Sequence, residues 1–165
     1  MTPADLLADS FDRILEDAER LLDGLDDAVL LERPGPVANP IAWLVWHLTR
    51  VQDDHVADVA GTGQTWPEWT ERFGLPFRVR DTGYGHDAAA VGKVRVPAEL
   101  LLGYHDATHA RTVEYVSRVT DDDLQRVVDE RWDPPVTLGV RLVSVVSDDL
   151  QHAGQAAFVR GLLPH

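Results

Sequence analysis

The strongest constraint on the fold is a helical spacing of apolar residues in the first part of the chain. Between Pro3 and Leu25, apolar side chains recur at intervals of three and four, which places them on one face of a helix. They are Leu7, Phe11, Ile14, Leu15, Ala18, Leu21, Leu22 and Leu25. The spacing predicts a first long helix, and Gly24 near its end is a typical helix terminator. Such a helix must bury its apolar face against other elements.

Further long helices are predicted from start signals and apolar content. Asn39-Pro40 is typical of an N-cap followed by proline at the first helical position, so a second helix is expected over residues 40–60. Pro97 marks the start of a third helix, and a fourth is expected over residues 138–162. No stretch shows a convincing strand pattern. The expected fold is therefore all-α, an antiparallel-type four-helix bundle.

A long segment without a regular period connects the second and third helices. Residues 61–96 contain eight glycines and prolines, interleaved with five aromatic residues. Loops of this length are uncommon inside small domains and are often functional. We therefore expect an ordered crossover, with a helical turn at residues 67–73, that packs over the bundle as a lid or pocket wall.

The third helix is unusually polar for an element of a bundle core. Thr108 and Thr112 lie on its expected inner face and are predicted to line a cavity. The same helix carries His105 and His109, which are four residues apart, so the two imidazoles can bind one metal ion. By local spacing alone, this pair is the strongest metal-binding motif of the chain.

Composition limits the classes of partner. Fifteen Lys and Arg against 28 Asp and Glu give a formal net charge of -13, which repels phosphate backbones and anionic membranes. No run approaches the roughly 18 apolar residues of a spanning helix, and the acidic start is unlike a targeting sequence. We expect a soluble, cytoplasmic protein with one domain over residues 1–165, without nucleic-acid or membrane partners. Because cysteine is absent, any thiol chemistry requires a thiol from outside.

The fourth helix carries charged and ligand-type side chains within an apolar stretch. Asp148 and His152 are four residues apart and can converge on one ion, and Asp149 is a possible substitute. A buried carboxylate costs several kcal/mol unless it is paired or metal-bound. Alternatively, Asp148 meets an arginine at the surface. A third ligand must come from another helix, where His47 and His55 lie about 12 Å apart and cannot both bind the same ion.

Two segments and the long connection carry a family resemblance. The segments are NPIAWLVWHLTRVQDDH in the second helix and SDDLQHAGQAAFVRG in the fourth. With them, nearly the whole chain resembles the DinB-like four-helix-bundle superfamily. Within it, the chain is similar to the branch related to mycothiol-dependent maleylpyruvate isomerase and other low-molecular-weight thiol S-transferases. The resemblance implies a bundle whose second and third helices are joined by a long crossover.

The resemblance also implies a metal site. The usual triad of the family maps onto His47, Asp148 and His152, and a carboxylate at the second position is typical of the maleylpyruvate isomerase branch. Two imidazoles, a carboxylate and an open position suit a catalytic zinc ion, and nickel or iron fits the same ligands. A bound ion would lower the pKa of an external thiol such as mycothiol.

The expected function is therefore a metal-dependent transfer of a mycothiol-type thiol to a small electrophile. Two alternatives stay open: a small-molecule hydrolase with metal-bound water as the nucleophile, and a non-catalytic bundle that binds a metal or ligand. On the crossover, Arg78 and Arg80 are predicted to bind the cofactor or substrate. The other candidates for a pocket are His105, His109, Trp43 and Gln155.

A homodimer is also expected from the second helix, which is apolar nearly all round. Trp43 and Trp46 on this helix require cover. The cover can come from a second copy or from the crossover.

Overall fold

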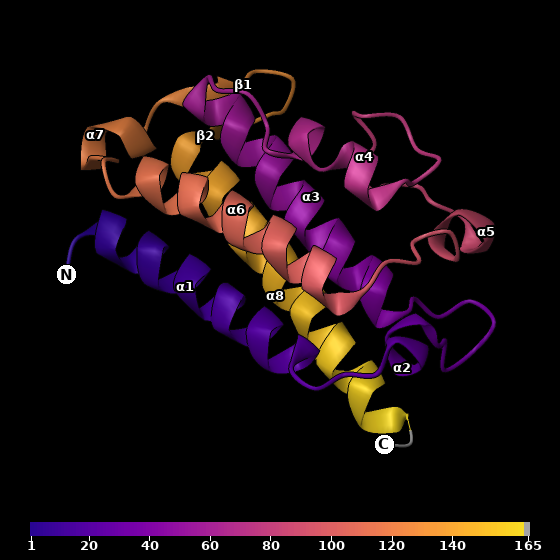
Figure 1. Ribbon diagram of the computed structural model, residues 1–165. Coiled ribbons are helices and arrows are strands. Elements are labelled where there is room, and N and C mark those ends of the chain that lie inside the picture. Colours follow the sequence, from indigo (N-terminus) through magenta and orange to yellow (C-terminus); the bar gives the residue numbers. More distant parts are fainter. Residues whose placement is uncertain (164–165) are drawn as a thin grey trace.

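A computed structural model describes residues 1–163, in which four long helices lie side by side (Figure 1). They are α1 (Pro3–Leu22), α3 (Ile41–Ala60), α6 (Ala98–Val116) and α8 (Leu138–Leu162). Each of α3 and α1 packs against both α6 and α8. The prediction of an all-α four-helix bundle is confirmed.

The directions of the helices explain the long crossover. Thr49 of α3 lies beside His105 of α6, and Tyr115 at the other end of α6 donates to the carbonyl oxygen of Val59, so α3 and α6 run parallel. The chain must therefore return along the bundle between them. Against α8, α3 runs antiparallel, because His47 meets His152 near one end and His55 meets Arg141 nearer the other.

The helix boundaries follow local capping, with small shifts from the predicted positions. The Thr2 side chain accepts from the backbone N–H of Asp5 at the start of α1, and α1 ends at Leu22 rather than Leu25. Pro40 stands in an extended conformation, so it caps α3 instead of being its first residue. Gly61 ends α3 with a φ of 67°, a conformation that glycine adopts without steric cost.

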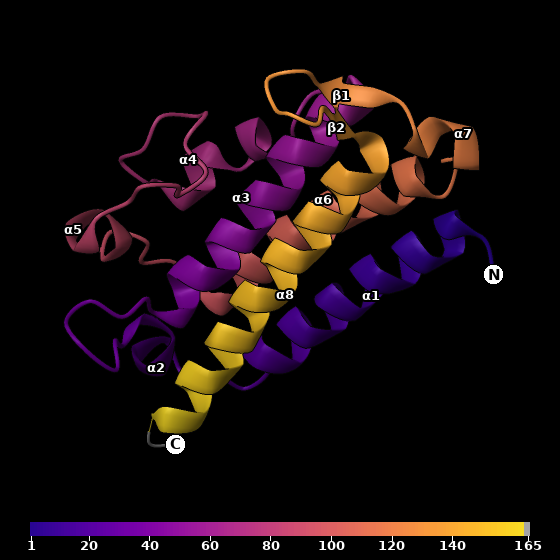
Figure 2. The same ribbon diagram turned by 180° about the vertical axis from the view of Figure 1, so that it is seen from behind.

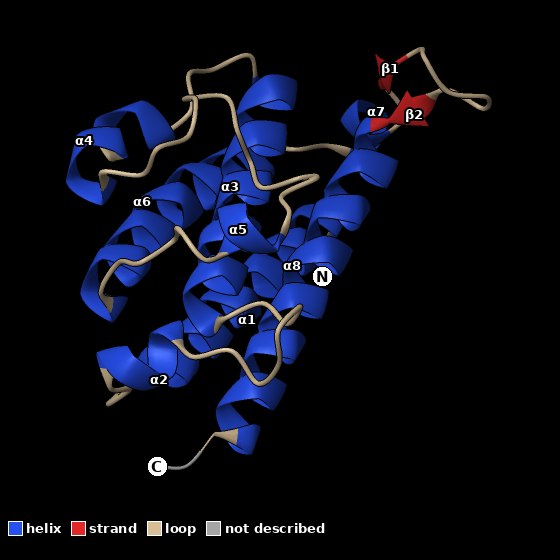
Figure 3. Ribbon diagram, turned by 90° about the vertical axis from the view of Figure 1, so that its right-hand side faces the viewer, coloured by secondary structure: helices blue, strands red, loops and turns tan. Residues whose placement is uncertain are grey.

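Short helices and two short strands lie in the connections between the four long helices (Figure 3). The predicted turn at residues 67–73 is present as η1 (Trp66–Glu68) and α4 (Thr70–Phe73). The others are α2 (Asp27–Leu31), α5 (Ala88–Val91), α7 (Asp121–Leu124), β1 (Val127–Asp129) and β2 (Val136–Thr137). The two strands form an antiparallel pair that was not predicted, because strands of three and two residues are too short to show an alternating pattern.

The crossover covers the outer side of α3. Every residue from 41 to 53 is buried. Trp46 packs against Trp66 and Phe77 of the crossover and stacks on His86. The crossover therefore supplies the cover that α3 requires, so Trp43 and Trp46 need no second copy to bury them.

Within the described part of the chain, no helix is both long enough and apolar enough to pass through a membrane.

Candidate metal centre

Three side chains from two helices converge at the predicted metal site. His47 of α3 meets Asp148 and His152 of α8, and one possible ligand atom of each lies within 4.8 Å of the other two. The two imidazole rings are nearly perpendicular, with centroids 4.6 Å apart. Among residues 1–163, no other group of three or more His, Asp or Glu side chains converges in this way. The structure thus brings together the three residues that the sequence singles out.

Backbone carbonyls fix which nitrogen each imidazole presents to the site. His47 Nδ1 lies 2.5 Å from the carbonyl oxygen of Thr82, and His152 Nδ1 lies 2.8 Å from that of Asp148. A carbonyl oxygen only accepts, so both Nδ1 atoms carry the proton. The Nε2 atom of each ring is then left with a lone pair, which is the form a metal ligand needs.

The neighbouring residues Asp148 and Asp149 have different environments. Asp148 is half-buried, and its Oδ2 lies 3.3 Å from His152 Nδ1. Asp149 is fully buried, and neither of its carboxyl oxygens has a hydrogen-bond partner. Burial, reinforced by the negative charge of Asp148, raises the pKa of Asp149 well above its usual value. Asp149 is therefore a core residue whose surroundings favour the neutral acid, and only Asp148 belongs to the cluster.

Burial and mutual contact shift the pKa values of the triad in different directions. Burial lowers the pKa of His47, and its bond to the Thr82 carbonyl offsets this only in part. Burial also lowers the pKa of His152, but hydrogen bonding to Asp148 outweighs this effect, so the net shift of the His152 pKa is upward. For Asp148, burial favours the neutral acid, but hydrogen bonding and charge interaction with the imidazoles lower the pKa.

In metal-free protein, we expect His152 to titrate above, and His47 below, the usual histidine pKa of about 6.5. Protonated His152 then stabilises the fold below about pH 6.5, and this contribution is lost as the pH rises through its folded pKa. His47 acts oppositely, because the unfolded chain takes up its proton more readily and stability falls as the pH drops below about 6.5. Imidazole NMR titrations, assigned with the His47→Asn and His152→Asn variants, test this order. One shared midpoint would contradict it.

Gly83 brings the crossover backbone directly against His47. Its φ is 106°, and a Cβ at this position would stand 2.6 Å from His47 Nδ1. It would also lie 3.2 Å from Trp43, whose ring stacks on His47 with centroids 4.5 Å apart. The absence of a side chain at Gly83 thus allows the neighbouring Thr82 carbonyl to reach His47.

Replacing Gly83 with alanine is expected to displace His47 and to weaken metal binding by about 10- to 100-fold, the usual cost of losing an orienting partner. Gly85→Ala is the matched control. Gly85 also has a positive φ, 74°, but a Cβ there meets no atom within 4 Å. Both variants incur the backbone strain of a left-handed residue, roughly 1–2 kcal/mol. Competition with a chromophoric chelator measures the metal affinity of each variant. Equal losses of affinity in Gly83→Ala and Gly85→Ala would show that backbone strain, rather than the contact with His47, causes the effect.

A cavity of about 400 Å³ opens beside Asp148. Its volume lies within the range of small-molecule sites. Tyr84 of the crossover stands at its edge, with its ring perpendicular to that of His47 at 5.2 Å. Arg141 lines the wall, donates to Asp129 Oδ2 at 3.3 Å, and lies 3.2 Å from His55 Nδ1. Any ligand in this cavity would lie next to the triad.

Sequence reasoning missed most of these wall residues. A signal existed for Arg141, which stands seven residues before Asp148 and so on the same face of α8 two turns away. Trp132 and Val136 also line the cavity, but they lie on the β1–β2 hairpin, for which the sequence shows no strand pattern. A contact between two such distant segments leaves no local pattern.

The predicted binding residues on the crossover and near the end of α8 do not lie at the cavity beside Asp148. Arg78, Arg80 and Gln155 are exposed, and none of them lines the cavity beside Asp148. Trp43 is buried at the site, where it stacks on His47 and donates from its indole N–H to His86 Nδ1 at 3.2 Å. Of these four residues, the structure places only Trp43 against the triad.

The rival pair on α6 does not form a comparable centre. His105 is fully buried, with Nδ1 3.0 Å from the Thr49 hydroxyl, and burial lowers its pKa to about 3. His109 is largely buried and turns toward α1, where its Nε2 lies 3.0 Å from Asp12 Oδ1. His105 is therefore a neutral buried polar group that contacts Thr49 rather than a metal ligand paired with His109.

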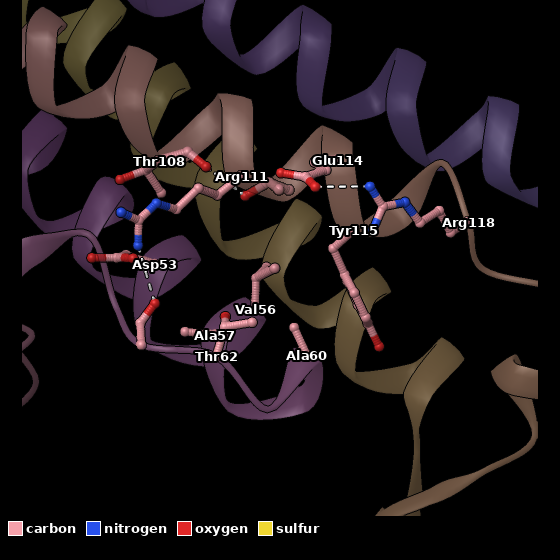
Figure 4. Close-up of a pocket in the computed structure, with 12 residues that line it drawn as sticks. Asp53, Val56, Ala57, Ala60, Thr62, Thr108, Arg111, Glu114, Tyr115 and Arg118 are labelled. Carbon is pink, nitrogen blue, oxygen red and sulfur yellow. Dashed lines mark hydrogen bonds and ion pairs between the residues drawn. The ribbon is translucent and has the colours of Figure 1, made fainter.

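A second cavity, of about 390 Å³, lies between α3 and α6 (Figure 4). Thr108 and Thr112 line it, as the polar face of the third helix predicts. Asp53 and Arg111 stand at the same cavity, but no member of the triad does. The two cavities are therefore separate.

A buried charge network fastens the crossover to α3. The Arg50 guanidinium is fully buried and donates to the carbonyl oxygens of Asp81 and Val79 at 3.2 and 3.3 Å. Asp53 accepts from the backbone N–H groups of Thr65 and Trp66, both at 2.7 Å. Arg50 and Asp53 also contact each other at 3.4 Å. One end of the crossover is thus held by Asp53, and the stretch leading to Thr82 is held by Arg50.

Comparison with known proteins agrees with this architecture. A family model described as mycothiol-S-transferase matches residues 6–164. The chain is also similar to the crystal structure of a conserved protein from Enterococcus faecalis, with 33% sequence identity and a TM-score of 0.90. That match covers 98% of this chain and 97% of the other. No curated protein matches the chain.

Proposed function

Because the chain belongs to the mycothiol-S-transferase family, we propose that it transfers a mycothiol-type thiol to a small electrophile, with a divalent metal ion as cofactor. The observation that carries the proposal is the convergence of His47, Asp148 and His152, of which Asp148 also lines a cavity of small-molecule size. Both imidazoles have Nδ1 engaged by a carbonyl oxygen, which leaves Nε2 available for an ion.

The donor set of the triad fits the proposed ion. Asp148 Oδ2 is shielded from solvent and lies 3.3 Å from His152 Nδ1, so it supplies a negatively charged oxygen beside the two imidazoles. Two imidazoles and one carboxylate are typical ligands of catalytic zinc, and nickel and iron accept the same set. A bound ion with an open position would lower the pKa of a thiol held there.

The protein's own residues would orient the reactants. The chain has no cysteine, so the thiol must enter from solvent through the cavity beside Asp148. Tyr84 and Trp132 offer aromatic surface to the entering molecules, and Arg141 offers a cationic one. His47 is held in place by Thr82 on one side and by Trp43 stacking on its ring. Such preorganisation reduces the cost of bringing thiol and electrophile together.

The test uses zinc-loaded protein, mycothiol and monochlorobimane, whose chloride leaves as the sulfur–carbon bond forms. We expect fluorescent conjugate to form faster than without protein, and a His47→Gln variant to lose this acceleration. Glutathione in place of mycothiol is the control for thiol recognition. No acceleration, together with no spectral change when mycothiol is added to cobalt-substituted protein, would contradict the proposal.

The same samples separate the alternatives. A hydrolase would cleave a nitrophenyl ester without added thiol, because metal-bound water is then the nucleophile. A structural ion would show no exchangeable position, so neither thiol nor azide would alter the cobalt spectrum.

A further inference from the structure

The cavity beside Asp148 reaches well beyond the triad. Its lining residues on α8 run from Asp148 back to Val140, a distance of about 12 Å along the helix axis. On α3 its lining includes His55, which lies about 12 Å along that helix from His47. Because α3 and α8 run antiparallel, both distances lead away from the triad in the same direction.

The far end of this cavity is formed by His55, Asp129, Trp132 and Arg141, and we refer to it as the distal end. It lies where α3 ends and α8 begins, at the β1–β2 hairpin (Figure 2). A small electrophile must come within about 3–3.5 Å of a sulfur atom held at the triad, so it stays away from the distal end. The body of a long thiol, in contrast, can extend from the triad to the distal end.

His55 offers the distal end a fixed hydrogen-bond donor. Its Nδ1 lies 3.2 Å from a terminal nitrogen of Arg141, and a guanidinium only donates, so Nδ1 carries a lone pair. The proton of the neutral ring is then on Nε2. Burial, assisted by the positive charge of Arg141, lowers the pKa of His55 and favours the neutral ring. Among residues 1–163, no acceptor binds the Nε2–H group, so it is available to a ligand in the cavity.

The charged groups of the distal end neutralise one another. Asp129 is buried and accepts from Arg131 Nε at 2.9 Å and from Arg141 at 3.3 Å. The Arg141 guanidinium also lies 3.8 Å from the carboxylate of Asp58. Both guanidinium groups at this end therefore already have carboxylate partners, and a carboxylate on the ligand would have to compete with them. Hydroxyl groups, which both donate and accept, suit such paired side chains better.

Trp132 adds an aromatic surface to the distal end. It is 66% exposed in the β1–β2 hairpin, and it lines the cavity. One face of a sugar ring presents C–H groups, which pack on an aromatic ring, while the hydroxyls at its edge need donors and acceptors. Trp132 together with His55 and Asp129 offers both kinds of contact.

On the basis of the thiol transfer proposed above, we propose that the distal end binds the uncharged, hydroxyl-rich body of the thiol cosubstrate. His55 Nε2–H donates to this body and Trp132 stacks on it, while the sulfur lies at the triad. Mycothiol has the required chemistry, because its acetylcysteine is linked to an uncharged sugar and inositol. Glutathione carries carboxylates at both ends, and these would compete with Asp129 and Asp58 for the arginines. The distal end thus selects which thiol is used.

NMR titration of the zinc-loaded protein tests this binding without any transfer reaction. The probes are mycothiol, its acetylglucosaminyl-inositol body without cysteine, and N-acetylcysteine without that body. We expect the first two to shift the Trp132 indole N–H and the His55 Nε2 resonances, and N-acetylcysteine to shift neither. The Trp132→Phe and His55→Gln variants assign these resonances. An unshifted Trp132 indole at millimolar mycothiol, or a neutral His55 ring protonated at Nδ1 in the free protein, would overturn the proposal.

Kinetics with monochlorobimane measures thiol selection as the ratio of kcat/KM for mycothiol to kcat/KM for N-acetylcysteine. His55→Leu and Trp132→Ala should each lower this ratio about tenfold, through a higher KM for mycothiol, because each removes one contact with the thiol body. His55→Gln should keep the ratio, since its amide oxygen can accept from Arg141 while its amide N–H replaces Nε2–H. Phe158→Ala is the matched control for Trp132→Ala, because Phe158 is 67% exposed and lies outside this cavity.

The two measurements distinguish failure of this proposal from failure of the proposed function. If the wild type accelerates conjugation with neither thiol, the transfer reaction is contradicted, and the NMR shifts still decide whether the distal end binds the thiol body. If it accelerates conjugation, an unchanged ratio in His55→Leu and Trp132→Ala would overturn the proposal. Equal losses in His55→Gln and His55→Leu would contradict the donor role of His55. Circular dichroism and zinc content confirm that each variant retains its fold and its metal.

Discussion

Replacing His152 with alanine is expected to abolish stoichiometric metal binding and to leave the helical bundle folded. His152 supplies one of only two imidazoles in the triad, and its Nε2 is the atom left free by the bond from Nδ1 to the Asp148 carbonyl. Loss of an orienting partner already costs 10- to 100-fold in affinity, so loss of a ligand should exceed about 100-fold. Elemental analysis after dialysis, together with circular dichroism, measures both outcomes.

Variants of the rival histidine pair are the controls for this experiment. His105→Ala and His109→Ala should retain the ion, because His105 is engaged with Thr49 in the core and His109 with Asp12 of α1. His105→Ala removes a buried side chain, so its thermal unfolding must be recorded beside its metal content. Metal lost from the α6 variants and kept in His152→Ala would move the site to α6.

Replacing Asp53 with alanine is expected to reduce the free energy of unfolding by roughly 3–5 kcal/mol, the usual cost of leaving a buried charge without its partner. Arg50 is fully buried and would keep its guanidinium among neutral acceptors. The backbone N–H groups of Thr65 and Trp66 and the Tyr104 hydroxyl would also lose their acceptor. Urea unfolding followed by circular dichroism measures the change.

Asp54→Ala is the matched control for Asp53→Ala. The neighbouring Asp54 is only partly buried and accepts a hydrogen bond from the side chain of Gln64. Its loss should therefore cost no more than about 1 kcal/mol. Asp53→Ala should also weaken metal binding, because Arg50 positions the segment from Val79 to Asp81 that leads to Thr82. Equal stability of the two variants would show that the network does not hold the crossover.

The helices and the triad were predictable because their signals are periodic. A spacing of four on one helix already places Asp148 and His152 on adjacent turns of one face. The choice between Asp148 and Asp149 also followed the family position, and burial of Asp149 agrees with it. Arg78, Arg80 and Gln155 were chosen by residue type alone, and type does not tell which side of a loop or helix faces a cavity.

Sequence patterns predicted the all-α class, the four long helices, the crossover and the convergence of His152 with an aspartate about one turn away, because each of these signals lies between near neighbours in the chain. Spacing left His47, His55 and the α6 pair open, the family resemblance favours His47, and the structure places His47 beside Asp148 and His152. Packing also brings Gly83 against His47 and places the crossover, rather than a second copy, over α3. These features join residues far apart in the chain, so they depend on how whole helices and the crossover pack against one another.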